Sequence, residues 1–423
     1  MNYQAPRGTY DVLPEDINRW HYVEQIIRKL TRLYGYAEVR FPIFEQLDLF
    51  QRSVGEDTDI VEKEMYTLTD KKGRQLALRP EGTASIARLF VEHSMQTSQK
   101  DPLRLWYMGP MFRYSRPQKG RYRQFIQFGV ECVGSEEPII DAEIIAIGWH
   151  ILQEAKVPKV SLEINSVGCP ECREAYNSTL TEFLYTNKEQ YCSDCQRRMD
   201  KNPLRVFDCK NTTCQTLIKH APRMLDHLCE ECDKHFDGVK TFLDMMKIPY
   251  TVNPEIVRGL DYYTKTAFEY KINYLGAQDA LGGGGRYDGL IEYLGGRSTP
   301  AVGLSMGLER ILLSLEKSGF KFPLDGALEV LIIPIGEQAL LASIHTMQTL
   351  HDNGISAVIA DVHSSVGSNL KLCDKSNISY AILIGEEELK SGKYPIKTIS
   401  KKTQEVIDKD SIVQYILNKR TKK

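Results

Sequence analysis

Two strand-like runs around a basic loop constrain this chain more than any other feature. Residues 103–113 and 125–133 flank a loop that contains proline and glycine, which predicts an antiparallel hairpin. Side chains alternate between the faces of a strand, so Gln127 and Glu131 share one face with the bare Gly129. Burying a polar strand face is unfavourable without partners, so this face indicates a ligand or a polar network. The opposite face is apolar and carries Ile126, Phe128, Val130 and Cys132.

The loop of the hairpin concentrates positive charge. It carries Arg116, Lys119, Arg121 and Arg123, with Arg113 at its base. Such a run is either a solvated surface or a phosphate-binding loop, and the loop alone favours neither interpretation. The net charge of −2 for the whole chain supplies no general attraction for nucleic acid, so any basic binding surface has to be local.

A second polar stretch indicates a ligand with a particular chemistry. Arg258 precedes the adjacent Tyr262 and Tyr263, and a strand-like segment extends to Tyr270. Four consecutive glycines follow at positions 282–285, where the bare backbone permits close approach. An arginine and two tyrosines beside such a backbone suit a ligand that has both negative charge and a flat polar ring.

Charged residues also fall at the starts of two predicted helices. A short strand in residues 74–79 is broken by Pro80 and Gly82, and a helix covers residues 84–90, so Glu81 and Thr83 lie at its start. Glu81 suits a helix cap, and it also suits the ammonium group of a ligand. Residues 301–307 predict a strand and residues 308–315 a helix, with Arg310 in a first turn where the helix dipole disfavours a cation.

The remaining segments predict an α-helical start and a separate domain at the C-terminal end. A helix is expected from Leu13 to about Gly35, followed by a strand over residues 37–42. Residues 140–156 predict a helix and 160–165 a strand. Three short apolar runs then alternate with helical segments at 329–334, 356–360 and 380–384, which is typical of a small α/β domain with a parallel or mixed sheet.

Eight of the ten cysteines gather in one polar, helix-prone segment that has the character of an insertion. They form four close pairs: Cys169 and Cys172, Cys192 and Cys195, Cys209 and Cys214, Cys229 and Cys232. This spacing is typical of structural zinc, in two Cys₄ sites or in one site with spare cysteines. His220, His227 and His235 are alternative ligands. The competing interpretation is a set of reduced cysteines that pack as small apolar residues.

Length, composition and absent motifs narrow the class of protein. A chain of 423 residues is expected to form two or three domains. No apolar run reaches the roughly 18 residues of a membrane span, and the N-terminus has no apolar signal core, so we expect a cytoplasmic protein that does not bind membranes. The sequence lacks the common nucleotide-binding glycine fingerprints and the hydrolase motifs His-Glu-x-x-His and Gly-x-Ser-x-Gly.

The motifs together resemble the class II aminoacyl-tRNA synthetases. Residues 112–131 resemble the second signature motif of that class, residues 303–310 the third, and the segment ending at Phe41-Pro42 the first. Residues 258–263 and 284–289 resemble the two signatures of the histidyl-tRNA synthetase family, bacterial type, and residues 78–83 also resemble that family. The resemblance runs from Arg7 into the C-terminal domain, with no departure at these positions.

The resemblance implies a reaction and a role for each site residue. Histidine and ATP form histidyl-adenylate and pyrophosphate, and the histidyl group passes to the 3′ end of tRNA(His). Arg258 and Arg113 are implied to be catalytic, at the histidine carboxylate and the α-phosphate, where planar guanidinium groups suit oxyanions. Arg121 and Arg310 are implied to hold the ATP triphosphate, together with Mg²⁺. The residues implied to bind histidine are Glu81, Gly82, Thr83, Gln127, Glu131, Tyr262, Tyr263 and Tyr287.

Within that set the resemblance assigns different parts of histidine to different residues. Glu81, Thr83 and Gln127 face the α-ammonium group. Glu131 and Tyr263 face the imidazole, with Tyr287 nearby, and a carboxylate or hydroxyl suits a ring that carries a donor nitrogen.

The implied architecture is an α+β catalytic domain on an antiparallel sheet, with a helical Cys-rich insertion and a C-terminal α/β anticodon-binding domain. We expect the catalytic domain at residues 1–325, the insertion at 168–240 and the anticodon-binding domain at 326–423. The class also implies a homodimer. The alternatives are the non-catalytic regulatory subunit of ATP phosphoribosyltransferase, which shares the fold but not the intact signatures, and a nucleic-acid-binding module, which leaves the Gln127–Glu131 face unexplained.

Overall fold

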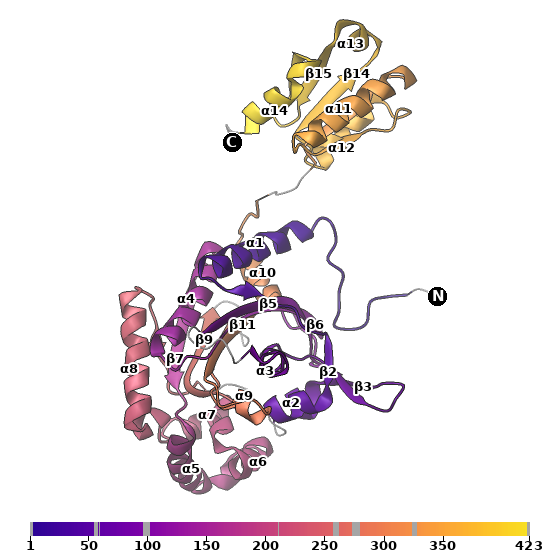
Figure 1. Cartoon of the computed structure of the whole chain (residues 1–423). Coiled ribbons are helices and arrows are strands. Elements are labelled where there is room, and N and C mark those ends of the chain that lie inside the picture. The colour runs from indigo at the N-terminus through magenta and orange to yellow at the C-terminus, as the bar shows by residue number, and fades with distance from the viewer. Residues whose placement is uncertain are drawn as a thin grey trace. The chain divides into compact units, whose positions relative to one another are not determined.

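The chain forms two compact units, Met1–Phe322 and Pro323–Lys423 (Figure 1). The structure is a computed structural model, and it describes residues 3–54, 58, 60–95, 102–209, 211–256, 262–272, 280–323 and 328–420. Within that part of the chain, no helix combines the length and the apolar character that crossing a membrane requires.

An eight-stranded sheet organises the first unit, with strand order β1-β5-β6-β11-β10-β9-β7-β8. Its interior pairs are antiparallel, and only the edge pairs β1–β5 and β7–β8 are parallel. The predicted hairpin is confirmed as β5 and β6. The strands are β1 (Ala37–Glu38), β5 (Leu103–Phe112), β6 (Gln124–Val133), β7 (Val160–Ser166), β8 (Thr251–Val252), β9 (Thr264–Ile272), β10 (Ala280–Arg286) and β11 (Ala301–Gly307).

One face of this sheet packs on helices and forms the main core. The apolar side chains of β6, including Phe128 and Val130, join residues of α1 (Ile17–Leu33), α4 (Pro138–Glu154) and α10 (Leu308–Lys317). The alternation predicted for residues 125–133 is therefore confirmed, because Phe128, Val130 and Cys132 are buried in this core. The other face of the sheet curves around α3 (Thr83–Glu92) in Figure 1.

Two N-terminal elements are shorter than predicted. The first helix begins at Ile17 rather than Leu13, because the backbone N–H groups of Asp16 and Ile17 both bond to the Leu13 carbonyl and close a separate turn. The strand predicted for residues 37–42 ends at Glu38. The carbonyls of Phe41 and Pro42 accept hydrogen bonds from Arg79 Nη1, at 2.8 and 3.2 Å, instead of joining a ladder.

A small sheet and a helical insertion complete the first unit. The small sheet has the order β2-β4-β3, formed by β2 (Phe44–Gln46), β3 (Tyr66–Thr69) and β4 (Gln75–Leu78), beside α2 (Leu47–Val54). The cysteine-rich segment is helical as predicted: α5 (Pro170–Tyr185), α6 (Ser193–Lys201), η4 (Pro203–Asp208), α7 (Thr212–Ile218), η5 (Met224–His227) and α8 (Glu230–Met245). It has its own core, to which all eight cysteines contribute.

The second unit is a mixed five-stranded sheet with the order β13-β12-β14-β15-β16. The three predicted apolar runs form β12 (Val330–Pro334), β13 (Ala357–Ile359) and β14 (Tyr380–Ile384), which are parallel. The hairpin β15 (Lys393–Thr398) and β16 (Thr403–Asp408) adds two antiparallel strands. The helices are α11 (Leu340–Asp352), α12 (Val366–Lys375), α13 (Glu386–Ser391) and α14 (Ile412–Arg420).

Candidate active site

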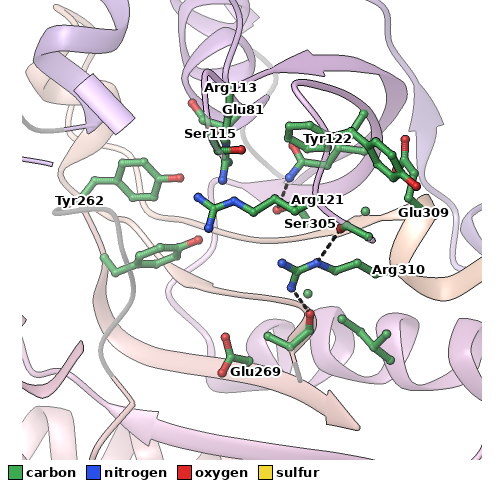
Figure 2. A pocket seen from close by; sticks show the side chains of 18 residues that line it. Glu81, Arg113, Ser115, Arg121, Tyr122, Tyr262, Glu269, Ser305, Glu309 and Arg310 are labelled. Carbon is green, nitrogen blue, oxygen red and sulfur yellow. Dashed lines mark hydrogen bonds between the residues drawn. The ribbon is translucent and has the colours of Figure 1, made fainter. Parts of the chain in front are cut away.

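A polar cavity of about 360 Å³ opens on the face of the large sheet that does not pack on the core helices. Its walls come from the hairpin β5–β6, from β9, β10 and β11, and from the start of α10. Figure 2 shows Arg113 and Arg121 on one side of the cavity, Arg310 beside them, and Tyr262 and Glu269 at its edges. Three arginines and several acceptors thus share one space, which suits a ligand that carries both anionic and cationic groups.

Glu131 lies at the centre of a buried hydroxyl cluster behind this cavity. Its Oε1 atom accepts a hydrogen bond from Thr83 Oγ1 at 2.9 Å, and its Oε2 atom accepts one from the Tyr287 hydroxyl at 2.7 Å. Tyr107 donates a longer bond of 3.5 Å to Oε1. Glu131 is fully buried, and burial raises its pKa to about 8 despite these hydroxyl donors.

Small residues on the neighbouring strand make room for that carboxylate. The register of β6 with β11 sets Glu131 opposite Gly303, Gly129 opposite Ser305 and Gln127 opposite Gly307. A Cβ atom on Gly303 would lie 1.6 Å from Glu131 Oε2. A glycine is therefore required at position 303 for Glu131 to occupy its place.

Unpartnered polar atoms mark the part of the cavity near Gln127. The Gln127 amide donates to Ser305 Oγ at 3.1 Å. Among the described residues, Gln127 Oε1 and the Tyr262 hydroxyl are buried polar atoms without a hydrogen-bond partner. Buried polar atoms are normally paired, so both atoms indicate that a ligand group completes this wall.

Glu81 serves as the cap that its position predicted. Its two carboxylate oxygens accept hydrogen bonds from the backbone N–H groups of Thr83 and Ala84, at 2.6 and 2.9 Å, at the start of α3. The same carboxylate lines the cavity, and burial raises its pKa. The two interpretations of Glu81 are compatible, because a capping carboxylate retains lone pairs for a ligand ammonium group.

Arg113 is a half-buried cation of the cavity. Its Nε atom donates to the Pro80 carbonyl at 2.9 Å, and its guanidinium carbon lies 5.5 Å from the centroid of the Phe125 ring. Burial lowers its pKa, which the nearby Glu64 and Glu81 oppose and Arg121 reinforces. A fixed cation with two fixed neighbours needs little reorganisation when negative charge develops beside it.

The other two arginines are held at the rim. Arg121 pairs with Glu64 at 2.5 Å. Arg310 donates to the carbonyls of Gly120 and Ala280, so its guanidinium joins the hairpin loop to the start of β10. These carbonyls account for the cation in the first turn of α10, where the helix dipole disfavours positive charge.

The structure brings most of the predicted site residues together. Thr83, Glu131 and Tyr287 form the hydroxyl cluster behind the cavity, and Gly82 is the N-cap residue of α3, against the Tyr107 ring. Arg258 lies outside the described residues. The predicted residues that line the cavity itself are Glu81, Arg113, Arg121, Gln127, Tyr262, Tyr263 and Arg310.

Sequence reasoning missed several residues of the same site. Ser305 bonds Gln127, Tyr107 approaches Glu131, and Glu269 lines the cavity. The alternation of side chains between the two faces of a strand could have identified Ser305. On the predicted strand, Ser305 shares one face with Gly303 and Gly307. The same alternation on β9 separates Glu269 from the buried Phe268 and Tyr270.

The four consecutive glycines are part of strand β10. The atoms that lie closest to most of them belong to the neighbouring strands rather than to the cavity. A Cβ atom on Gly284 would lie 1.9 Å from the Gly303 carbonyl oxygen, and one on Gly285 would lie 2.4 Å from the Thr266 carbonyl oxygen. Gly282 lines the cavity. The glycines therefore allow the strands to pack closely, and one of them also lines the cavity.

A buried ion network fixes the end of that strand. Arg286 pairs with Asp141 of α4 and, at 3.1 Å, with Asp288, and both Arg286 and Asp141 are fully buried. His235 of α8 contacts the same Asp141 at 3.2 Å. Burial alone would raise the pKa of Asp141, but Arg286 and His235 lower it to about 2. Tyr287, the next residue after Arg286, is thereby anchored beside Glu131.

The eight cysteines of the insertion separate into two sets of four. One set is Cys169, Cys172, Cys229 and Cys232, and the other is Cys192, Cys195, Cys209 and Cys214. Within each set the sulfur atoms lie within 4.8 Å of one another. The sulfur–sulfur separations of 3.5 Å for Cys169–Cys172 and 3.8 Å for Cys192–Cys209 are much longer than a disulfide bond of about 2.05 Å.

The raised pKa of Glu131 predicts how stability depends on pH. The folded protein holds the proton up to about pH 8, whereas the unfolded chain releases it near 4.5. Wild-type unfolding free energy should therefore fall between these pH values, by as much as about 1.4 kcal/mol per pH unit, relative to Glu131→Gln. Denaturant unfolding of both proteins at pH 5, 6.5 and 8 measures this difference, and parallel pH dependences would contradict it.

Comparisons with known proteins agree on one family. The family model described as "Histidyl-tRNA synthetase" matches residues 8–311, and that described as "Anticodon binding domain" matches residues 329–419. The chain is 49% identical over 399 residues to the histidine–tRNA ligase of Halothermothrix orenii, covering 94% of this chain and 95% of that protein. It is 46% identical over 411 residues to the histidine–tRNA ligase of Desulforamulus reducens, covering 97% and 98%. The crystal structure of apo histidyl-tRNA synthetase from S. aureus superposes with a TM-score of 0.83 at 39% identity, covering 98% of this chain and 99% of that one.

Proposed function

Because this chain belongs to the histidyl-tRNA synthetase family, we propose that the cavity beside Glu131 binds L-histidine and ATP and forms histidyl-adenylate there. The chain is a histidine–tRNA ligase, an enzyme that activates histidine with ATP and then transfers it to the 3′ end of tRNA(His). The observation that carries the proposal is the shared cavity, which joins three arginines to a polar wall with unpaired atoms.

Histidine binds with its ammonium group toward Glu81 and Gln127. The Glu81 carboxylate and the unpaired Gln127 Oε1 are acceptors, and an ammonium group offers three donors. Thr83 connects this end of the pocket to Glu131. The imidazole is directed toward Tyr263 and the Glu131 cluster, where Tyr287 and Thr83 fix the orientation of the carboxylate.

Adenylate formation places new negative charge among the arginines. An oxygen of the histidine carboxylate attacks the α-phosphorus of ATP, and the bond from that phosphorus to the bridging oxygen of pyrophosphate breaks. Arg113 stabilises the charge that develops on the α-phosphoryl oxygens, because its guanidinium is already oriented by the Pro80 carbonyl. Arg258 shares this role with Arg113 by its correspondence to the family signature.

Arg121 and Arg310 hold the remaining phosphates of ATP at the rim of the cavity. Mg²⁺ bound to ATP would neutralise part of the triphosphate charge. The Glu269 carboxylate, which lines the cavity, is a hard oxygen ligand of the kind that Mg²⁺ prefers.

In this proposal the second unit is the anticodon-binding domain, at residues 326–423. The catalytic domain precedes it, at residues 1–325. The family match to residues 329–419 supports that assignment. We further propose a homodimer, which light scattering measures directly, and a cytoplasmic location, where ATP and tRNA are both supplied.

Structural zinc in the insertion at 168–240 is part of the same proposal. Each set of four cysteines offers four sulfur ligands, and tetrahedral zinc with bonds of about 2.3 Å separates its sulfurs by about 3.8 Å. The observed Cys169–Cys229 and Cys192–Cys209 separations are 3.9 and 3.8 Å. Two Cys₄ sites therefore fit the donors better than one site with spare cysteines.

Histidine-dependent exchange of pyrophosphate into ATP tests the proposed activity. We expect exchange with L-histidine and none above background with the other amino acids, because a site lined with unpaired polar atoms rejects analogues by about 10⁴-fold or more. A well-folded protein without histidine-dependent exchange would instead support the regulatory-subunit alternative. Charging of tRNA(His) transcripts then measures the second step.

A further inference from the structure

The two cysteine sets occupy different positions in the insertion. We call Cys169, Cys172, Cys229 and Cys232 the inner site, and Cys192, Cys195, Cys209 and Cys214 the outer site. The inner site joins the two ends of the insertion, because Cys169 follows β7 of the large sheet and Cys229 is the N-cap residue of α8. The Cys229 backbone N–H donates to Cys172 Sγ at 3.1 Å, across 57 residues of sequence.

We propose that zinc at the inner site holds the histidine pocket in its binding geometry, whereas zinc at the outer site stabilises only the outer part of the insertion. The proposal rests on the zinc binding proposed above and on the assignment of the pocket. It adds that one metal site positions residues of the histidine pocket, and that the other does not.

The first connection from the inner site runs through the backbone before Cys169. The Val167 N–H donates to the Lys265 carbonyl at 2.7 Å, and the Lys265 N–H donates to the Gly168 carbonyl at 3.0 Å. Lys265 has a positive φ of 49°, a conformation that is uncommon for residues other than glycine. Val167 also packs in one cluster with Tyr263 of the cavity wall. A shift of the chain at Cys169 would therefore move the start of β9 and Tyr263, the residue before it.

The second connection runs along the first two turns of α8. Glu231, which lies between the ligands Cys229 and Cys232, pairs with Lys265 at 2.7 Å. His235, three residues beyond Cys232, contacts Asp141 at 3.2 Å, and Asp141 pairs with Arg286. Arg286 precedes Tyr287, whose hydroxyl bonds Glu131. Figure 1 shows α8 lying alongside α4, the helix that carries Asp141.

The outer site has a weaker connection among the described residues. The Arg223 guanidinium lies 5.4 Å from the centroid of the Phe207 ring, two residues before Cys209, and pairs at 3.0 Å with Glu255, whose side chain is exposed. The principal packing partners of α6, η4 and α7 are one another and α5. Figure 1 shows α5, α6 and α7 grouped in one lobe. Loss of metal there should loosen this lobe without displacing Tyr263 or Tyr287.

Paired variants test the difference between the sites. The inner variant is Cys229→Ser with Cys232→Ser, and the outer variant is Cys209→Ser with Cys214→Ser. Zinc is counted by elemental analysis of freshly purified full-length protein, and histidine-dependent pyrophosphate exchange gives KM for histidine and kcat. We expect two zinc ions per wild-type chain and one per chain in each variant. The inner variant should show KM for histidine raised at least about 10-fold, and the outer variant should stay within about 2-fold of wild type.

Each result has a distinct meaning. Wild-type protein without zinc overturns the metal proposal and leaves the histidine–tRNA ligase assignment intact. One zinc lost from each variant, with equal effects on exchange, overturns the special role of the inner site. Absence of histidine-dependent exchange in the zinc-loaded wild type overturns the proposed function instead.

A variant that keeps all eight cysteines tests the connection if the inner variant does not fold. His235→Leu removes the contact with Asp141 and leaves both sites complete, whereas His235→Gln retains a donor at that position. We expect two zinc ions in both proteins, KM for histidine raised about 5-fold in His235→Leu with kcat nearly unchanged, and recovery of most of that loss in His235→Gln. Unchanged KM in His235→Leu would overturn the route through α8.

Discussion

Replacing Arg113 with methionine is expected to slow histidyl-adenylate formation by about 10³-fold while changing KM for histidine and ATP much less. The guanidinium is half-buried, and the Pro80 carbonyl holds it at 2.9 Å. It lies over the Phe125 ring, so its orientation is set before the substrates bind. A charge that acts mainly on the transition state lowers kcat and kcat/KM together when it is removed.

Methionine is the informative substitution because it retains an unbranched side chain in the same half-buried space. Single-turnover measurement of adenylate formation at saturating histidine and ATP gives the rate of the chemical step. Arg74→Met is the matched control, since the Arg74 side chain is exposed and pairs with Asp70, away from the cavity. Its rate should stay within about 2-fold of wild type. A raised KM for histidine or ATP with normal kcat in Arg113→Met would instead assign Arg113 to ground-state binding alone.

Period-two alternation was sufficient to predict the arrangement of β6. Gln127 and Glu131 face the site, and Phe128 and Val130 face the core, as the sequence indicates. The prediction succeeds because one face of this strand is buried against helices, and a one-residue slip would invert every side chain. The strand at 301–307 and the helix after it are predictable for the same reason.

The partners of Glu131 were not predictable from such local patterns. Thr83 and Tyr287 are 48 and 156 residues away in sequence and meet only when β6, α3 and the end of β10 converge. Alternation gives the face of a side chain but not the neighbour that it will contact. The resemblance to the family identified the same residues, but it did not show which hydrogen bonds they form.

The pairing of the cysteines also depends on the path of the chain. Each close pair of cysteines suggests two ligands, but spacing does not say which pairs combine. The observed sets are nested: the pair at 169 and 172 meets the pair at 229 and 232, and the pairs between them form their own set. That arrangement arises because α5 and α8 begin side by side, where the Cys229 N–H bonds Cys172 Sγ.

Gly303→Ala is expected to lower kcat/KM for histidine by at least about 100-fold, because the added methyl group would occupy the position of the Glu131 carboxylate. A Cβ atom at this position would lie 1.6 Å from Oε2, the oxygen that accepts the Tyr287 hydroxyl. Glu131 would have to turn away and leave that hydroxyl without its acceptor, together with the imidazole that we propose it binds. Overpacking of this kind also costs about 1–3 kcal/mol of stability.

A glycine that has open space around it is the control. It separates the clash with Glu131 from any general effect of replacing a glycine with alanine. A Cβ atom added to Gly367 in α12 would meet no atom of another segment within 4 Å. Gly367→Ala should therefore exchange pyrophosphate normally and gain up to about 1 kcal/mol of stability from its helical position. Histidine-dependent exchange and denaturant unfolding of both variants measure the two effects. Normal kcat/KM for histidine in a folded Gly303→Ala protein would show that Glu131 does not need its observed position, and would remove it from the imidazole site.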